Sequence, residues 1–220
     1  MQDLIKQEQF ELEVLDKLNS KRFLNSLILG GGTMLRLCFG LERFSVDLDF
    51  WVIKKVNFAK LFKDLKEFLA GNYAIKDSAH KFYTLLFEIK SRDYPRSLKL
   101  EIRKEKKKIR TEPAIAYSKY SNMQVLLRVV SLKDMMREKI NAFLDRRQIR
   151  DVFDIEFLLK KGIGLDVDSD TLQKLLDRVE SLGKKDYTTK LGSILEEEKR
   201  KYYIAENFKI LKLAIRGKIG

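Results

Sequence analysis

The chain has 220 residues, of which 45% are hydrophobic and 35% are charged, and its formal net charge is +13. This length allows one substantial domain or two small ones with a real core. The positive charge favours a polyanionic partner such as RNA or DNA, and a basic surface that serves solubility alone is the alternative. One cysteine and one histidine exclude a disulfide framework, a cysteine-rich zinc site and histidine-based catalysis. No stretch approaches the roughly 18 apolar residues of a membrane span and no signal peptide is evident, so we expect a soluble, cytoplasmic protein without a membrane partner.

The first elements in chain order are a helix, a short strand and a second helix. Apolar residues at helical spacing predict an amphipathic helix over residues 3–19. Ile28-Leu29 is typical of the end of an apolar strand, Gly30-Gly31-Gly32 of a tight turn, and Met34 to Phe39 of a helix. A strand, a glycine turn and a helix start present free backbone N–H groups, which suit a phosphate. The turn is neither a Walker A loop nor a dinucleotide fingerprint, because no Gly-Lys follows and Leu35 replaces the third glycine.

An acid pair follows on a second strand that we expect to end at about Ile53. Asp47 and Asp49 alternate with apolar residues, so the strand directs both carboxylates to one face. Two like charges side by side repel, and a divalent metal is the usual partner that relieves the repulsion. A solvated acidic edge strand is the alternative. In the preceding loop, Arg43 and Ser45 could reach phosphate oxygens, although Arg43 could also be a surface cation.

The remaining elements predict a mixed α/β half followed by a helical half. We expect a helix over residues 57–69, strands near 73–77, 82–89, 98–102 and 115–117, and helices from 131 onward. The boundary is placed near residue 125, which gives an α/β core over residues 1–125 and a helical domain over residues 126–220. Glu101 lies opposite the apolar face of its strand and is a candidate third metal carboxylate, with an ordinary exposed glutamate as the alternative.

The helical half contains two charges on apolar faces. In a helix over residues 131–146, Lys139 falls on the buried stripe, where an ammonium needs an anion unless it snorkels to the surface. Asp154 lies among apolar residues and needs a cation, for which Lys139, Arg150 or a metal could serve. Asp151 is expected to cap the N-terminus of its helix.

A dense basic run extends from Arg103 to Arg110. Such a run could track the backbone of a nucleic acid. A solvated hairpin end is the more usual role of a run of this kind.

Together these residues resemble the motifs of the AbiEii/AbiGii toxin family, a branch of the polymerase-β-type nucleotidyltransferase superfamily. The superfamily pattern is Gly-[Gly/Ser], a spacer of nine to thirteen residues, and Asp-x-[Asp/Glu]; Gly32-Thr33 and the acid pair are separated by thirteen residues. The resemblance spans about residues 25–160. It is carried by Gly31-Gly32-Thr33-Met34-Leu35, Arg43-Phe44-Ser45-Val46-Asp47-Leu48-Asp49-Phe50, Lys139 and Arg150-Asp151-Val152-Phe153-Asp154.

The resemblance implies an α+β fold, in which a nucleotidyltransferase core with a mixed β-sheet flanked by helices precedes a C-terminal helical domain that completes the active site. It also implies a role for each candidate residue. Asp47 and Asp49 would hold Mg²⁺, with Glu101 as a loosely matching third acid, and Asp154 would be the essential later acid. The nucleotide-binding residues would be Gly31, Gly32, Thr33, Arg43, Ser45 and Lys139.

The expected function is Mg²⁺-dependent transfer of NMP from an NTP such as ATP to an acceptor hydroxyl. The resemblance implies a tRNA 3′ end as the acceptor and a toxin role beside a separately encoded antitoxin. Transfer of AMP to a protein hydroxyl is an alternative within the same enzyme class. A non-catalytic nucleic-acid-binding module is an alternative of another class, against which the intact pair Asp47 and Asp49 argues.

Overall fold

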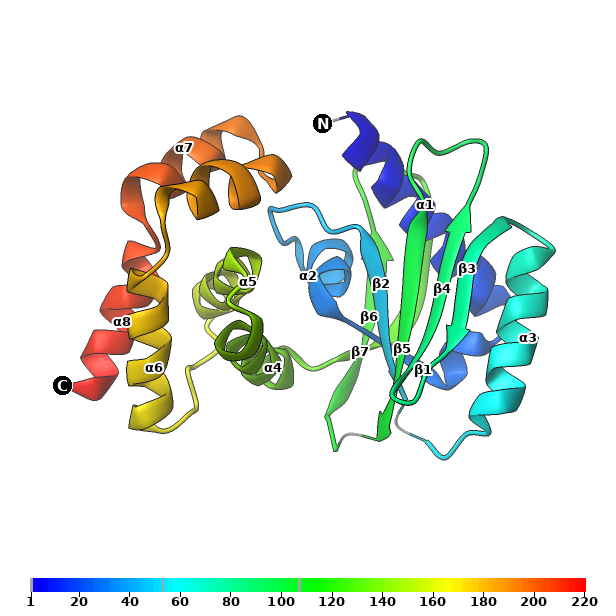
Figure 1. Cartoon of the computed structure of the whole chain (residues 1–220), viewed down its shortest axis with the longest axis horizontal. Coiled ribbons are helices and arrows are strands. Elements are labelled where there is room, and N and C mark those ends of the chain that lie inside the picture. The colour runs from blue at the N-terminus through cyan, green and yellow to red at the C-terminus, as the bar shows by residue number, and fades with distance from the viewer. Residues whose placement is uncertain (1, 53, 107) are drawn as a thin grey trace. The chain divides into compact units, whose positions relative to one another are not determined.

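The computed structural model describes residues 2–52, 54–106 and 108–220, and they form two compact units (Figure 1). The first unit comprises Met1–Gly40 and Phe44–Ser131, and the second comprises Leu41–Arg43 and Leu132–Gly220. The boundary expected near residue 125 falls within a strand of the first unit, Gln124–Val130. Ile53, the expected end of the acid-pair strand, and Lys107 of the basic run lie outside the described residues.

The described residues of the first unit form a mixed seven-stranded sheet in the order β3-β4-β5-β2-β1-β7-β6. Strand β2 runs parallel to β5, and β1 runs parallel to β7, while the other neighbours are antiparallel. This arrangement confirms the expected mixed α/β fold. The strands are β1 Leu27–Gly30, β2 Asp47–Val52, β3 Ala74–His80, β4 Thr84–Lys90, β5 Leu98–Lys106, β6 Thr111–Tyr117 and β7 Gln124–Val130.

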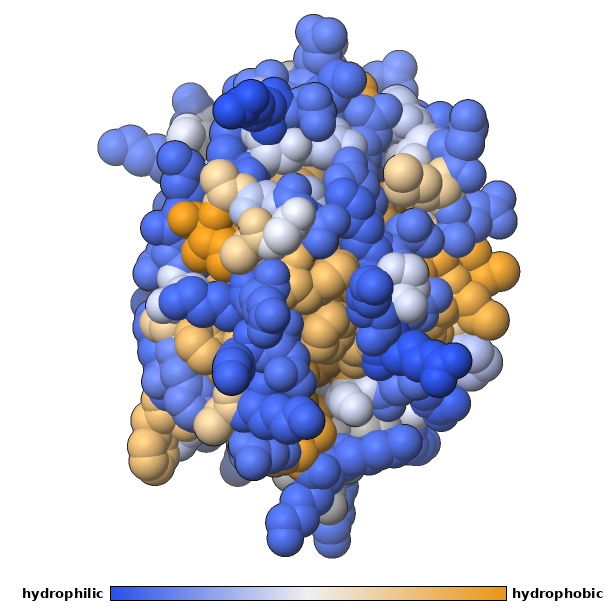
Figure 2. Space-filling view, turned by 90° about the vertical axis from the view of Figure 1, so that its right-hand side faces the viewer, coloured by the Kyte–Doolittle hydropathy of each residue, from blue (hydrophilic) through white to orange (hydrophobic). Residues whose placement is uncertain are grey.

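Helices flank this sheet (Figure 1). They are α1 Gln2–Ser20, α2 Gly31–Phe39 and α3 Phe58–Ala70, with a short 3-10 turn, η1 Phe23–Asn25. Helix α3 begins where the sequence predicts, because the Asn57 side chain accepts a hydrogen bond from the Lys60 amide at 3.0 Å. It packs on the sheet through Phe62, whose ring stacks on Phe87 with 5.1 Å between centroids. In Figure 2, the face of the molecule on the α3 side is mostly hydrophilic, and its hydrophobic side chains gather in separate patches.

The second unit is helical from residue 132 onward, as the sequence predicts. Its helices are α4 Leu132–Arg146, α5 Ile149–Lys160, α6 Ser169–Glu180, α7 Glu197–Glu206 and α8 Lys209–Ile219, with the π-helical segment η2 Asp186–Leu191 and the short turn η3 Gly192–Ile194. Among the described residues, no helix of the chain is both long and apolar enough to cross a membrane.

A buried carboxylate, that of Glu156, links three helices in the core of the second unit. Glu156 on α5 is fully buried. It accepts hydrogen bonds from the Tyr203 hydroxyl at 2.9 Å, the Lys160 ammonium at 2.8 Å and the Leu211 amide at 3.2 Å. These bonds join α5 to α7 and α8, so the polar group fixes the way in which the helices pack.

Two elements differ from the expectation. The sequence does not predict strand β7, because Leu126 follows Val125 and interrupts the alternation of apolar and polar residues that marks a strand. In the structure Leu126 lies on the outer face of the strand, where its side chain is 65% exposed. Helix α2 begins at Gly31 rather than near Met34. Two glycines therefore belong to its first turn, a position that intrinsic helix propensity disfavours.

Candidate functional site

The acid pair stands at the start of β2. Leu48 and Phe50 are fully buried on one face of this strand, while Asp47 and Asp49 on the other face are only half-buried. The two carboxylates thus share a face, as the alternation predicts.

The first turn of α2 lies directly against the Asp49 carboxylate. A Cβ atom built on Gly31 would lie 2.3 Å from Asp49 Oδ2, and Gly31 has a φ of +73°. Both observations require glycine at this position, because any other side chain would overlap the carboxylate and strain the backbone. The glycine run therefore brings the N-terminus of a helix to the acid pair, where its backbone amides favour negative charge.

Thr33 fixes the spacing between α2 and β2. Its side chain is fully buried, and its hydroxyl donates a hydrogen bond to the Asp47 carbonyl oxygen at 2.7 Å. The hydroxyl thus has a partner inside the protein, and its evident role is to position the helix. Gly32 is buried beside it, and Ser45 is half-buried just ahead of β2.

Glu101 lies next to Asp49 in the sheet. In the parallel pairing of β2 and β5, Asp49 is in register with Glu101, and Asp47 is in register with Lys99. Within the described ranges, however, no group of three or more His, Cys, Asp or Glu side chains is arranged to hold a metal ion. The role of Glu101 as a ligand therefore stays a prediction, and the candidate ligands are the two aspartates.

A second acidic group, which the sequence analysis missed, lies on α1. Glu11 is fully buried, and neither of its carboxylate oxygens has a hydrogen-bond partner among the described residues. Burial raises the pKa of Glu11 well above its usual value, and the charges of Glu8 and Asp47 raise it further, whereas Arg36 lowers it. Glu8 is itself buried, paired with Arg36 and bonded by the Ser118 hydroxyl.

A sequence signal for these groups exists. Glu8 and Glu11 fall on the stripe that Leu4, Leu15 and Leu18 form at helical spacing, so both carboxyls occupy positions of the buried face.

The second unit contains a buried charge network centred on Asp154. Arg43 is 3% exposed and donates two hydrogen bonds to Asp154, each 2.6 Å long. The Lys139 ammonium lies 2.6 Å from Asp154 Oδ2 and 3.4 Å from Asp151 Oδ1. Arg146 in turn forms a two-bond pair with Asp151, at 2.7 and 2.8 Å.

This network gives each predicted residue a partner within the protein. Lys139 is buried rather than snorkelling, and its anions are Asp154 and Asp151. Burial acts to raise the pKa of Asp154, but Arg43 and Lys139 more than offset it, so this pKa lies below its usual value. The expectation that Asp151 caps its helix is wrong, because Gln148 is the N-cap residue and Asp151 lies inside the first turn.

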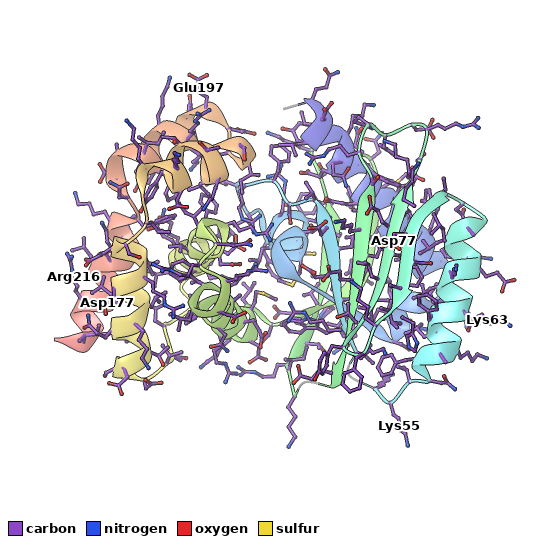
Figure 3. The ribbon with its side chains drawn as sticks, in the orientation of Figure 1. Lys55, Lys63, Asp77, Asp177, Glu197 and Arg216 are labelled. Atoms are coloured by element: carbon purple, nitrogen blue, oxygen red, sulfur yellow. The ribbon has the colours of Figure 1, made fainter. Side chains whose placement is uncertain are left out.

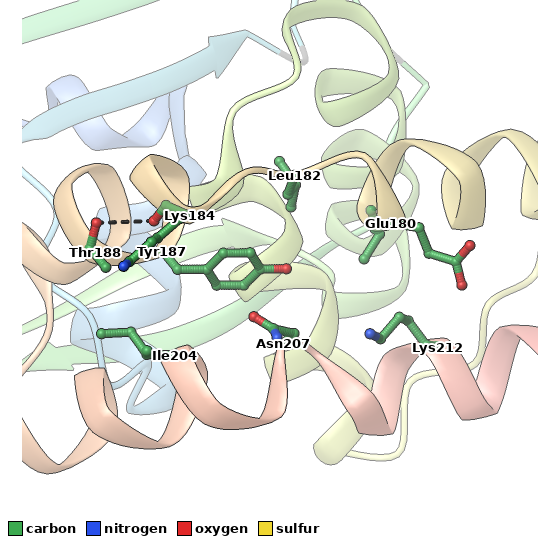
Figure 4. Close-up of a pocket in the computed structure, with 9 residues that line it drawn as sticks. Glu180, Leu182, Lys184, Tyr187, Thr188, Ile204, Asn207 and Lys212 are labelled. Atoms are coloured by element: carbon green, nitrogen blue, oxygen red, sulfur yellow. Dashed lines mark hydrogen bonds between the residues drawn. The ribbon is translucent and has the colours of Figure 1, made fainter.

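A pocket of about 510 Å³ also lies in the second unit (Figure 4). It is lined by Val179, Glu180, Leu182, Lys184, Tyr187, Thr188, Ile204, Asn207 and Lys212. None of the residues that the sequence singles out for chemistry belongs to it.

Solved structures with the same fold come from H. pylori. A proposed nucleotidyltransferase of this organism is 20% identical to the chain, with a TM-score of 0.55 and coverage of 95% of this chain and 96% of that one. The JHP933 protein is 22% identical, with a TM-score of 0.53 and coverage of 95% and 94%. At these identities the likeness establishes the fold alone. No curated protein matches the chain in sequence.

A family model gives the decisive finding. The model of the nucleotidyl transferase AbiEii toxin of type IV toxin–antitoxin systems matches residues 13–210. The matched residues include strand β2 with the acid pair, the glycine-rich first turn of α2 and the Asp154 network. The match confirms the resemblance to this family that the sequence motifs indicate. The chain therefore belongs to the AbiEii family of nucleotidyltransferase toxins.

Proposed function

We propose that the protein transfers NMP from an NTP to the 3′-hydroxyl of an RNA, in a reaction that depends on Mg²⁺. The observation that carries the proposal is the placement of the Asp47 and Asp49 carboxylates on one face of β2, with the first turn of α2 against Asp49. In this reaction the acceptor oxygen bonds to the α-phosphorus, the bond from that phosphorus to the bridging oxygen breaks, and pyrophosphate and a proton leave.

The residues present suit a magnesium ion. Mg²⁺ prefers oxygen ligands and is commonly held by one or two carboxylates, with substrate phosphates and water as the other ligands. Asp47 and Asp49 supply such a pair, and like charges on one strand face need a cation. When bound there, the ion would neutralise charge that develops around the transferred phosphoryl group.

The helix start supplies the phosphate site. The amides of Gly32 and Thr33 belong to the first turn of α2, where unsatisfied N–H groups bind anions. The hydrogen bond from Thr33 to the Asp47 carbonyl ties these amides to the acid pair. The chain thus holds the ligands of the metal and of the phosphates at a fixed spacing, which positions the reactive phosphorus.

We propose an RNA acceptor on the basis of the net charge of the chain and of the family to which it belongs. A net charge of +13 favours RNA over a protein acceptor, and the family resemblance implies a tRNA 3′ end. The toxin family further implies a cognate antitoxin, and the proposed reaction of NTP with tRNA would take place in the cytoplasm. The roles of Lys139 as a phosphate ligand, of Asp154 as an essential acid, and of Arg43 and Ser45 in nucleotide binding stay predictions.

Label transfer tests the proposal. Purified protein is incubated with Mg²⁺, bulk tRNA and each NTP in turn, labelled at the α-phosphate. We expect label on RNA with at least one NTP, none with EDTA, and a loss of about 100-fold or more in Asp47→Asn and Asp49→Asn, since each removes a charged ligand. Asp77→Asn is the matched control, because Asp77 is an exposed aspartate on β3 of the same sheet (Figure 3).

The results also separate the rival functions. Label on a protein band instead of RNA would assign a protein acceptor. A lack of label transfer with all four NTPs, together with equal Mg²⁺-dependent NTP binding by wild type and Asp49→Asn, would favour the non-catalytic module and contradict the proposal.

A further inference from the structure

The turn between β3 and β4 exposes two aromatic rings. Phe82 is 83% exposed and Tyr83 is 74% exposed, which makes them the most exposed of the large hydrophobic side chains in the described ranges. Aromatic rings bury a large apolar area when they find a partner. An exposed aromatic pair at a hairpin end therefore marks a binding surface better than a single exposed leucine does. We call Phe82 and Tyr83 the aromatic tip.

The aromatic tip is pre-organised. The two rings meet edge to face, with 4.6 Å between centroids and 84° between planes. The Lys81 amide donates to the Thr84 carbonyl at 2.9 Å, and the Lys104 amide donates to the Tyr83 carbonyl at 2.9 Å. The Lys104 ammonium closes the turn from the side, because it donates to the Lys81 carbonyl at 2.5 Å and to the Phe82 carbonyl at 3.3 Å. A partner would thus meet rings that are already ordered, which lowers the entropy cost of binding.

Cations surround the aromatic tip. Lys81 precedes the rings and is exposed, and the exposed Arg103 is in register with Thr84 directly after them. Exposed Lys54 and Lys55 follow β2, whose Trp51 is in register with Arg103. Figure 3 shows Lys55 extending away from the first unit beyond the end of its strands.

The aromatic tip also lies near the acid pair. On β5, Arg103 follows Glu101 by two residues, and Glu101 is in register with Asp49. On β4, Leu86 is in register with Glu101, and Tyr83 lies three residues before Leu86. Because β2 is two strands away from β4, Asp49 lies about 10 Å along the sheet and about 10 Å across it from the tip. A strand of nucleic acid held at the tip would therefore pass within a few nucleotides of the proposed catalytic aspartates.

We propose that the aromatic tip and its flanking cations bind single-stranded RNA. Flat rings stack on bases, which are exposed in a single strand and covered in a duplex, and the lysines and Arg103 contact the phosphates. The inference deepens the proposed function, since it rests on an RNA acceptor and names the surface that would hold it. Stacking is tolerant of sequence, so we expect little base preference at this surface.

Fluorescence anisotropy of a labelled, unstructured RNA of about 12 nucleotides tests the inference, in EDTA and without NTP. The double variant Phe82→Leu/Tyr83→Leu keeps exposed apolar side chains but removes the flat rings. We expect its affinity for RNA to fall by about tenfold or more, because stacking on two rings is lost. We expect Phe82→Trp to retain the affinity, and Arg103→Gln to reduce the slope of log affinity against log salt by about 0.7, the share of one phosphate contact with a single strand.

Tyr117→Leu is the matched control. Tyr117 is 55% exposed on β6, at the opposite edge of the sheet from β3 and β4, and we expect this variant to bind RNA as the wild type does. Because all these side chains are exposed, the variants should melt as the wild type does, which excludes misfolding as the cause.

Three outcomes would overturn the inference. The first is equal RNA affinity of the wild type and the Leu/Leu variant, and the second is equal affinity of the wild type for blunt duplex RNA and for the single strand. The third is a Leu/Leu variant that no longer binds anionic lipid vesicles but binds RNA as the wild type does. Failure of the proposed function looks different, because RNA binding that depends on the aromatic tip would persist while no NTP labels the RNA.

Discussion

Glu11 is a carboxyl group whose proton the fold retains. Buried in α1 without a hydrogen-bond partner among the described residues, it has a pKa raised well above 4.5 by desolvation and then by the charge of Glu8. Between 4.5 and this raised value, the folded protein holds a proton that the unfolded chain has released. Stability therefore falls as pH rises through that window, because the folded state binds more protons.

We expect Glu11→Gln to flatten this pH dependence. As pH rises through this window, the wild type loses stability and the variant does not. The unfolding free energy of the variant should therefore rise relative to that of the wild type by up to about 1.4 kcal/mol per pH unit. Thermal melts between about pH 5 and pH 8 measure it. Glu13→Gln is the control, because hydrogen bonds from Tyr94, Lys17 and Tyr73 outweigh burial and lower the pKa of Glu13; its effect on stability should be constant over this range. Parallel pH profiles of wild type and Glu11→Gln would contradict the prediction.

The pKa of Asp154 is shifted in the opposite direction to that of Glu11. Its pKa is lowered despite complete burial, because Arg43 and Lys139 stabilise the carboxylate. A carboxylate with a lowered pKa stabilises the folded state at pH values above 3.8, the usual pKa of an aspartate. This stabilisation is lost as the pH falls through the lower pKa of Asp154 in the folded protein. Asp154→Asn would leave Arg43 and Lys139 buried beside a neutral amide.

We expect Asp154→Asn to destabilise the protein by about 3–5 kcal/mol at neutral pH, which for a chain of 220 residues lowers the melting temperature by roughly 10 °C. Asp166→Asn is the control, since Asp166 pairs with Lys133 at 2.7 Å with both side chains about half exposed; its melting temperature should barely change. Calorimetry at neutral pH measures both. Similar melting temperatures for the two variants would show that the Asp154 network contributes no stability.

At the scale of elements, the junction of α2 and β2 determines the geometry of the proposed site. Gly31→Ala places a methyl group where Asp49 Oδ2 lies, at a φ of +73°. The left-handed backbone costs an alanine roughly 1–2 kcal/mol, and displacement of the carboxylate should reduce nucleotidyl transfer by about 100-fold.

Gly40→Ala separates the two effects of that substitution. Gly40 has a φ of +78°, but no atom lies within 4 Å of the place that a Cβ would occupy, so alanine there strains the backbone alone. We expect both variants to lose similar stability in thermal melts, and only Gly31→Ala to lose transfer in the labelling assay. Equal activity of the two variants would show that Asp49 need not stay where the structure places it.

Features encoded within a few residues were predictable from the sequence. The alternation around Asp47 and Asp49 predicts a shared strand face, and Asn57 predicts the start of α3, because both signals are local. The bond between Arg43 and Asp154 joins residues 111 positions apart, and no spacing rule reports such a contact. The burial of Glu11 was predictable from its position on the apolar stripe of its helix, whereas the lack of a hydrogen-bond partner among the described residues depends on distant contacts that no spacing rule reports.

At the scale of the whole molecule, the excess of 45 basic over 32 acidic residues fits both an RNA partner and a basic surface that serves solubility alone, and the salt dependence of RNA binding separates the two. Binding of a single strand through Z phosphate contacts releases counterions, so log affinity falls against log salt with a slope of about −0.7Z.

We therefore expect RNA affinity, measured by anisotropy in EDTA, to drop steeply between about 50 and 200 mM salt, by roughly 50-fold if four phosphates are contacted. Binding of an NTP with Mg²⁺ involves few phosphates and should weaken much less, which provides the internal control. An RNA affinity that does not change with salt would mean that the positive charge of the chain does not contact the RNA backbone, and a protein acceptor would then fit the chain better.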